Sequence, residues 1–332
     1  MATPLPQPLQ RAPITSARRL SPDRPVFLIG YSTSATTTAQ FVVKAETSGV
    51  IAKGVTADVK NAVQSSIMLM RDAARGARGR VLTEGERRDF LQAARPLLGS
   101  AADQTYLDVL RDEGTKLLWM LLGFKAGLVD LQGVIDSQAV LRACQVLLSL
   151  RDDENLDRLG RILATDLFLN NNDRFSIKPN ESSIQNLGNV FFVDKGNGTF
   201  KIKGLDVFDP SSNNALMSTT VRKGCDRMDS RDENYWSGPL LKDPDKRARV
   251  AQNALDSLYA ELGGVLREAK FPEPLIRNYK FSESHTKVVV KGMEAALVVI
   301  KASCKLRLAQ MRAGKVNADG LKSRMKVMGW ST

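Results

Sequence analysis

The sequence predicts an α+β fold in two parts, a small β-rich part followed by a larger, mainly helical part. Short apolar runs with strand character dominate residues 26–45, whereas from Thr56 onward apolar residues recur with the spacing of a helix face. A strand pair is predicted again within the helical part, where 190–193 and the run from Phe200 flank a Lys-Gly-Asn-Gly turn. The 332 residues are 43% hydrophobic and 25% charged, which is enough apolar material for a substantial core.

Residues 1–24 are predicted to be a disordered leader, because they are rich in Pro, Ser and Arg. Such a leader would suit either a simple tail or a bacterial secretion signal, and a secreted protein of this kind would act inside a host cell. The 3 cysteines are far apart and lack metal-ligand spacing, which favours a reducing compartment such as the cytoplasm. No apolar run reaches the ~18–20 residues of a membrane span.

An N-terminal lobe is predicted over residues 25–122. Two strands at 26–29 and 40–45 flank a turn of small residues, and an amphipathic helix follows at 56–70. The Arg-rich segment 71–88 is predicted as a solvated connection that could include an exposed helix. A buried strand is predicted at 116–122, in preference to a short core helix, because Gly123 and Gly127 follow closely. Residues 123–332 are predicted to form a helical lobe that also holds the strand pair and a basic C-terminal part. Its helices are expected at 136–150, 153–169, 245–268 and 287–312.

Polar residues at three places in the second lobe follow an order that is typical of phosphoryl transfer. Asp173 and Arg174 follow the apolar helix 153–169, Asn189 precedes the first hairpin strand, and Asp206 follows the second. In kinases an Asp in such a loop orients the acceptor hydroxyl, while an Asn and a second Asp hold Mg²⁺ on the ATP phosphates. The order therefore predicts Asp173 as a catalytic residue and Asn189 and Asp206 as metal ligands.

Several of these assignments have competitors. Asn186 and Asp209 also lie near the hairpin, and Asn189 is preferred over Asn186 because it directly precedes the strand. Arg174 is assigned to the catalytic group, where it could hold the loop or pair with a phosphate. Asp166, on the preceding helix, is expected to make a structural hydrogen bond. The alternative to a metal site is a hairpin with Asn and Asp at its turns.

A phosphate-binding site is predicted in the first lobe. Lys44 ends the apolar run 41–43, an arrangement like the strand that carries the ATP-binding lysine of kinases. Ser32 and Ser34 lie in the turn of small residues, where backbone N–H groups and hydroxyls could cradle phosphate. This turn lacks the Gly-x-Gly-x-x-Gly pattern, and an exposed Ser/Thr-rich turn is the alternative.

The carboxylate that normally orients this lysine is missing from its usual place. Kinases pair the lysine with a helix Glu, but no carboxylate lies between Asp58 and Asp72 on the predicted helix. Glu46 is two residues from Lys44, so the two side chains project from the same face of a strand. Glu46 is therefore the expected partner, with Gln64 as the alternative.

The runs at 166–175, 186–192 and 204–208 together resemble the actin-fragmin kinase branch of the phosphatidylinositol 3-/4-kinase-like fold. Arg174 and Phe175 match the Asp-Arg-Phe form of that branch. The segment Phe-Val-Val-Lys that ends at residue 44 is similar to its ATP lysine strand. The resemblance covers residues 26–210 and is strongest over 155–210.

A further part of the resemblance is 117–122, which is similar to the interlobe hinge strand and would set Leu121 and Leu122 beside the nucleotide. The resemblance implies a two-lobed protein kinase-like fold and an ATP- and Mg²⁺-dependent kinase that phosphorylates Ser or Thr of a protein, such as a host actin if the chain is a secreted effector. Two alternatives stay open: a phosphoinositide kinase, and a catalytically weak pseudokinase that serves as a basic interaction module.

The positive net charge indicates which kinds of partner the protein could bind. The net charge of +12 favours an acidic partner, such as nucleic acid, a phosphoinositide at a membrane surface or an acidic protein. Among proteins, the resemblance implies a cytoskeletal substrate. The basic residues of the C-terminal part are not interleaved with clustered aromatics, which argues against single-stranded nucleic acid as the partner. A solvated helix face is the alternative explanation for the same basic residues.

Overall fold

The computed structural model confirms an α+β chain, built from two antiparallel sheets and a mainly helical remainder. It describes residues 4–46, 55–169, 171, 174–175, 186–205, 238–314 and 318–332. Two compact units divide the chain, unit 1 with Met1–Met68 and Ala77–Phe124, and unit 2 with Leu69–Gly76 and Lys125–Thr332. Helix α1 (Ala57–Ala73) contributes its first part to unit 1 and its last turn to unit 2.

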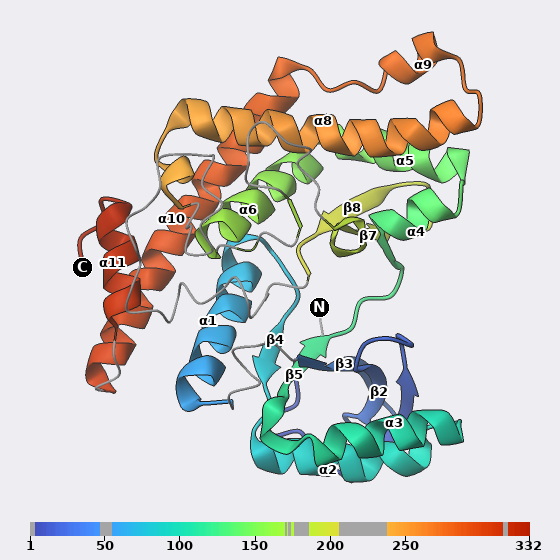
Figure 1. The fold of residues 1–332 in the computed structure, drawn as a ribbon, viewed down its shortest axis with the longest axis vertical. Helices are drawn as coiled ribbons and strands as arrows, with labels where there is room; N and C mark the ends of the chain where they lie inside the picture. The colour runs from blue at the N-terminus through green and yellow to red at the C-terminus, as the bar shows by residue number, and fades with distance from the viewer. Residues whose placement is uncertain are drawn as a thin grey trace. The chain divides into compact units, whose positions relative to one another are not determined.

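Unit 1 is built on a five-stranded antiparallel sheet of order β1-β2-β3-β5-β4 (Figure 1). Its strands are β1 (Ile14–Arg19), β2 (Val26–Ser32), β3 (Thr38–Glu46), β4 (Gly79–Val81) and β5 (Leu118–Gly123). Helices α2 (Glu84–Ala94) and α3 (Ala101–Asp112) cover one face, joined by the 3₁₀ turn η2 (Arg95–Leu97). The predicted strands at 26–29, 40–45 and 116–122 are therefore confirmed.

The core of unit 1 is aromatic and lies between the sheet and α2. The ring of Phe90 on α2 lies 5.7 Å from that of Phe27 on β2 and 5.6 Å from that of Trp119 on β5. Along β3, Phe41 and Val43 point into this core, because alternate side chains of a strand face opposite sides of the sheet. The intervening positions carry the polar groups of the candidate site.

The prediction that residues 1–24 form a disordered leader is wrong for the described part of that segment. Ile14 and Ala17 are the buried residues of β1, and β1 pairs with β2 with a register shift between Ile14 and Ser16. Leu9 is fully buried, and its backbone N–H donates to Glu86 Oε1 at 2.7 Å. The Pro- and Arg-rich composition could not predict these contacts, because they are made with residues elsewhere in the sequence.

The Arg-rich segment 71–88 is likewise more ordered than the solvated connection predicted for it. It contains the end of α1, β4 and the start of α2. Arg80 Nη2 lies 2.5 Å from Glu86 Oε1, and both side chains are largely buried. Thr83 caps α2 in a capping box with Glu86, so this carboxylate organises the whole turn.

Unit 2 combines a larger set of helices with a three-stranded sheet of order β6-β7-β8 (Figure 1). Its strands are β6 (Leu128–Asp130), β7 (Phe191–Asp194) and β8 (Phe200–Lys203), which confirms the predicted hairpin. The helices are α4 (Leu131–Asp136), α5 (Val140–Leu150), α6 (Asp153–Leu169), α8 (Pro244–Glu268), α9 (Glu273–Arg277), α10 (Glu283–Ala313) and α11 (Asp319–Val327). The predicted helix 136–150 starts later because Gln138 has a positive φ of 47°, which breaks the chain between α4 and α5.

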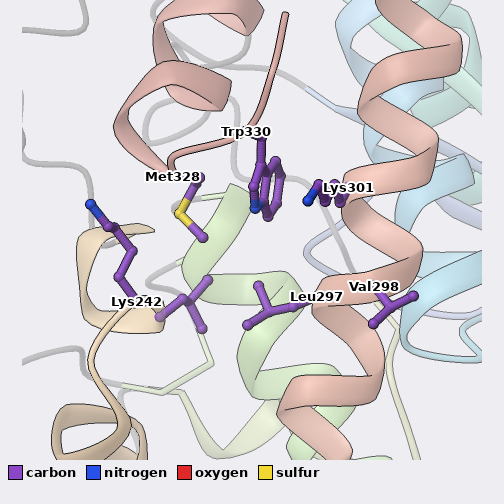
Figure 2. A pocket seen from close by; sticks show the side chains of 7 residues that line it. Lys242, Leu297, Val298, Lys301, Met328 and Trp330 are labelled. Atoms are coloured by element: carbon purple, nitrogen blue, oxygen red, sulfur yellow. The ribbon is translucent and has the colours of Figure 1, made fainter.

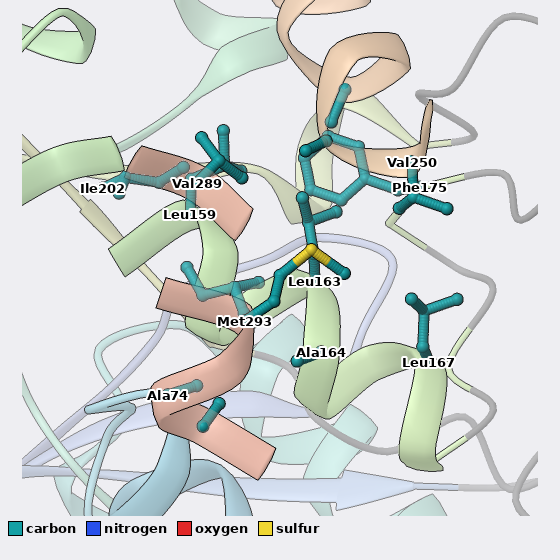
Figure 3. Packing of buried hydrophobic residues seen from close by; sticks show 14 of the residues in the cluster. Ala74, Leu159, Leu163, Ala164, Leu167, Phe175, Ile202, Val250, Val289 and Met293 are labelled. Atoms are coloured by element: carbon teal, nitrogen blue, oxygen red, sulfur yellow. The ribbon is translucent and has the colours of Figure 1, made fainter. Parts of the chain in front are cut away.

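Helices α6 and α10 pack unusually closely, because a glycine stands at each contact. A Cβ on Gly160 would lie 2.0 Å from the carbonyl oxygen of Val289, and one on Gly292 would lie 2.3 Å from that of Asp157. Figure 3 shows Leu159, Leu163, Met293 and Val289 meeting around this crossing. None of the described helices combines the length and apolar character needed to span a membrane.

Candidate active site

The candidate site of unit 2 is organised around the guanidinium of Arg174. Nε donates to Asp166 Oδ2 at 2.9 Å, Nη1 to the carbonyl of Asn189 at 2.6 Å, and Nη2 to the carbonyl of Leu205 at 2.5 Å. These acceptors lie at the end of α6, directly before β7 and just beyond β8. One side chain therefore joins three segments, which adjoin or contain the predicted positions 173, 189 and 206.

The contacts of Arg174 are those of a residue that positions the loop. Its side chain is 2% exposed, and the forked guanidinium is engaged by three protein oxygens. Of the two roles foreseen for it, the structure gives it the one of holding the loop.

Asp166 fixes both sides of the loop that contains the predicted catalytic residue. Its Oδ1 accepts from Asn171 Nδ2 at 3.0 Å, its Oδ2 binds Arg174, and its backbone carbonyl accepts from Asn171 N at 2.8 Å. The predicted structural hydrogen bond of Asp166 is thus confirmed. Asp173 itself, the proposed hydroxyl-orienting residue, lies outside the described residues.

Phe175 and Asn189 complete the described part of the site. Phe175 is 4% exposed and lies in the core of unit 2 near Leu163 and Val250 (Figure 3), so it anchors the chain next to Arg174. Asn189 is 3% exposed and ends the 3₁₀ turn η4 (Leu187–Asn189). Asn186, its competitor as a metal ligand, caps that turn by accepting from Gly188 N at 3.1 Å. The other proposed ligand, Asp206, lies outside the described residues.

A buried asparagine that the sequence analysis missed aligns the hairpin with α6. Asn155 Nδ2 donates to the carbonyls of Ser149 at 2.6 Å and Phe200 at 2.8 Å, and its Oδ1 accepts from Ile202 N at 3.0 Å. The available signal was an Asn within the apolar face of α6, where an unpaired amide would be costly. Asn155 at one end of α6 and the Arg174 network at the other fix β8 along this helix.

The C-terminal end of α6 is also held from α11. Arg324 is fully buried, and its Nη1 donates to the carbonyl of Phe168 at 2.6 Å. A cation that binds the last carbonyls of a helix satisfies groups that have no partner within the helix. Burial lowers the pKa of Arg324 to about 9. Arg324 is one of the basic residues of the C-terminal part, which were expected on a partner-binding or solvated helix face, and for Arg324 that expectation is wrong.

Lys203 is a second positioning cation that the sequence analysis did not single out. Its Nζ donates to the carbonyls of Arg75 at 2.5 Å and Gly76 at 3.2 Å, which follow α1. Desolvation, with a smaller contribution from Arg158, lowers the pKa of Lys203 to about 8. The last residue of β8 is thereby fixed to the segment 75–76 of the same unit.

In unit 1, Lys44 lies on β3 and forms an ion pair with Glu46. The lysine is 8% exposed, and its strand neighbours across the sheet are Val26 and Met120. The predicted pairing of Lys44 with Glu46 is confirmed. Gln64, the alternative partner, instead accepts a hydrogen bond from Val81 N at 2.9 Å.

The two serines of the predicted phosphate turn bond to one another. Ser32 Oγ donates to the carbonyl of Ser34 at 2.8 Å, and the turn closes through Thr33 N, which donates to the carbonyl of Thr37 at 2.8 Å. The strand register puts Ser32 on the same face of the sheet as Lys44. Ser34 Oγ accepts from Thr36 N at 3.4 Å, so both hydroxyls form hydrogen bonds within the turn.

The strand register puts the two predicted hinge leucines on opposite faces of the sheet. Leu121 pairs with Val43, and its side chain is fully buried in the aromatic core on the face opposite Lys44. Leu122 pairs with Val42 and shares the face of Lys44. Of the two leucines, only Leu122 therefore has its side chain on the face of the sheet that carries Lys44.

No protein-family model matches the chain, and no curated protein matches it significantly. What the chain does is therefore inferred from its own residues. The two relevant groups are the segments joined by Arg174 in unit 2 and the Lys44–Glu46 pair in unit 1.

Proposed function

We propose that this protein is an ATP- and Mg²⁺-dependent kinase with a two-lobed, protein kinase-like fold, which transfers the γ-phosphoryl group of ATP to a Ser or Thr hydroxyl of a protein. The observation that carries this proposal is the Arg174 network. A single buried side chain bonds to the helix before Asp173, to the backbone of Asn189 and to the residue before Asp206. Such a bridge is what three separated segments need in order to act as one site.

The roles of the three residues follow from their chemistry. Asp173 would orient the acceptor hydroxyl and accept its proton, while Asn189 and Asp206 would hold Mg²⁺. An amide oxygen and a carboxylate are suitable donors for this hard cation, and Asn189 is buried at the start of β7. When bound, Mg²⁺ neutralises charge that develops on the phosphates.

The Lys44–Glu46 pair supports the same function from unit 1. In protein kinases the phosphate-binding lysine is on strand β3 and is oriented by a carboxylate. Lys44 has that position here, and Glu46 supplies the carboxylate from the same strand. Both side chains rise from a strand that is paired on both sides, so little conformational freedom remains to be lost on binding phosphate.

The experiment is incubation of the purified full chain with Mg²⁺ and γ-labelled ATP, in the presence of either an acidic protein such as actin or phosphatidylinositol vesicles. Label on Ser or Thr of the protein, lost in Lys44→Ala, is the expected result. Label on the lipid alone would identify a lipid kinase instead. ATP binding without transfer to either acceptor would indicate a pseudokinase and overturn the proposal.

A further inference from the structure

A pocket lies in unit 2, bordered by α10, the 3₁₀ turn η5 (Gly238–Leu241) and the C-terminal residues after α11 (Figure 2). Its volume is about 340 Å³, and it opens to solvent on one side. The apolar part of its wall comes from five side chains, those of Leu241, Leu297, Val298, Met328 and Trp330. None of these residues belongs to the candidate active site.

The apolar wall is held in place and is accessible. Trp330 stacks on Phe168 with ring centroids 5.7 Å apart and an interplanar angle of 24°, so its indole is fixed against the end of α6. Val298 is 71% exposed, although it is a large aliphatic residue on α10. Aromatic and Met side chains that are held rigidly at an opening are the usual anchor sites of protein interfaces.

Two lysines give the rim of the pocket a positive charge. Lys242 and Lys301 are exposed and contribute to the lining, which contains no acidic side chain. Among the described residues, neither amine has an ion-pair partner. The nearest preceding acidic residue on α10, Glu294, is bound by Arg247 at 3.1 Å. The field at the rim therefore favours an anionic ligand.

We propose that this pocket binds an acidic segment of a partner protein, which inserts a large apolar side chain against Trp330 and Leu297 and sets carboxylates against Lys242 and Lys301. Pockets for small molecules are typically about 300–1,000 Å³ and enclose most of the ligand. This one is at the lower limit and open, so a side chain that remains attached to a peptide suits it better. A membrane surface would require a broader apolar helix face.

The proposal goes beyond kinase activity and does not depend on it. Its one connection to the candidate active site is the stacking of Trp330 on Phe168, near the end of the helix that precedes Asp173. An acidic protein bound here would be retained beside that loop. The pocket is tested by peptide binding, without any measurement of kinase activity. Asp173→Asn should therefore bind the peptide with the affinity of the wild type.

The test uses fluorescence anisotropy of the full chain with a fluorescein-labelled peptide, EDDLFDEE. Two control peptides remove one feature each: EDDSSDEE lacks the apolar pair, and KRRLFRKK reverses the charges. We expect both controls to bind at least about tenfold more weakly, which corresponds to a loss of about 1.4 kcal/mol. Added salt should also weaken binding of EDDLFDEE, because the rim lysines are exposed.

The protein variants separate the pocket from general basic charge. The double variant Lys242→Glu, Lys301→Glu and the single variant Val298→Asp should each weaken binding about tenfold or more. Lys291→Glu is the matched control, since Lys291 is exposed on the same helix but does not line the pocket. All these positions are exposed, and melting curves verify the fold.

Three results would overturn the proposal. The first is a loss of binding in Lys291→Glu as large as the loss in the pocket variants. The second is equal affinity for EDDSSDEE and EDDLFDEE. Either result would show that binding depends on charge alone and not on the pocket. The third is failure of every peptide to bind while phosphatidylserine vesicles bind in a Lys242- and Lys301-dependent way, which would identify a membrane site.

Discussion

Arg174 Nε lies 2.9 Å from Oδ2 of Asp166, and both side chains are almost completely buried. A buried ion pair of this kind contributes little net stability by its charge, but loss of one partner leaves the other charge uncompensated. Here the remaining guanidinium nitrogens bind the carbonyls of Asn189 and Leu205. The pair therefore controls how the predicted catalytic loop and hairpin are held together.

Replacement of Arg174 tests this positioning role. Arg174→Lys retains the charge but cannot match the three acceptors with one planar fork. We expect it to lower the free energy of unfolding by about 1–3 kcal/mol and to reduce phosphoryl transfer. Arg174→Met should cost more, about 3–5 kcal/mol, because Asp166 is then left buried and charged. Urea unfolding measures both, and an Arg174→Lys variant with wild-type stability and turnover would contradict the assignment.

The glycine contact between α6 and α10 predicts a stability difference between two similar substitutions. In Gly160→Ala the new Cβ would overlap the Val289 carbonyl, so we expect a loss of about 1–3 kcal/mol or more. Gly264→Ala is the control, because a Cβ at this helical position meets nothing within 4 Å. It should stabilise by about 0.5–1 kcal/mol through helix propensity. Thermal unfolding of both variants measures this difference. Equal changes in stability would show that α6 and α10 do not approach closely at Gly160.

Glu86 predicts a dependence of stability on acid pH. Burial alone would raise its pKa, but hydrogen bonds from Arg80, Thr83 and Leu9 outweigh this and lower the pKa from 4.5 to about 2. Because the folded-state pKa is the lower one, the stabilisation is complete above about pH 4.5 and is lost as the pH falls toward about 2. Its size is on the order of 3 kcal/mol.

Unfolding of the wild type, Glu86→Gln and Glu84→Gln between neutral pH and pH ~3 measures this contribution. Glu86→Gln should be less stable at neutral pH and should lose less stability on acidification than the wild type. Glu84→Gln is the control from the same helical turn, since that side chain is 53% exposed. A Glu86→Gln variant with the same acid sensitivity as the wild type would show that this carboxylate is not the group responsible.

The Lys44–Glu46 pair predicts coupled losses of activity. Lys44→Ala should weaken phosphate alignment, and Glu46→Gln should lower phosphoryl transfer in parallel, because the carboxylate orients the amine. If the two act as one unit, the double variant should be no worse than the more damaging single variant. Transfer rates for the four proteins of this cycle provide the measurement. Additive losses would mean that Glu46 does not act through Lys44.

Strong periodicity made much of the fold predictable. The apolar spacing of α6, α8 and α10 and the short apolar runs of β2, β3 and β5 gave these elements close to their observed bounds. β1 was not predictable in this way, because its Arg- and Ser-containing sequence becomes a strand only by pairing with β2. The composition of a segment reflects only its own residues, whereas strand pairing also depends on the strand that lies beside it in the fold.

The candidate site was predictable in its residue types and less so in its geometry. The two-residue spacing placed Glu46 beside Lys44, since strand alternation is a local property. The fixing of Arg174 by the carbonyls of Asn189 and Leu205 joins positions up to 31 residues apart, and no local pattern reveals it. The orientation of Leu121 likewise required the register between β3 and β5.

The most direct test of the central claim compares the wild type with Asp173→Asn. ATP affinity, melting temperature and rate of transfer from Mg²⁺-ATP to a protein acceptor are measured on both proteins in parallel. If Asp173 orients the acceptor hydroxyl, the rate should fall by roughly 10²–10⁴-fold while affinity and melting temperature barely change. Full phosphoryl transfer by Asp173→Asn would contradict the kinase mechanism, and a joint loss of stability and ATP binding would make Asp173 a structural residue.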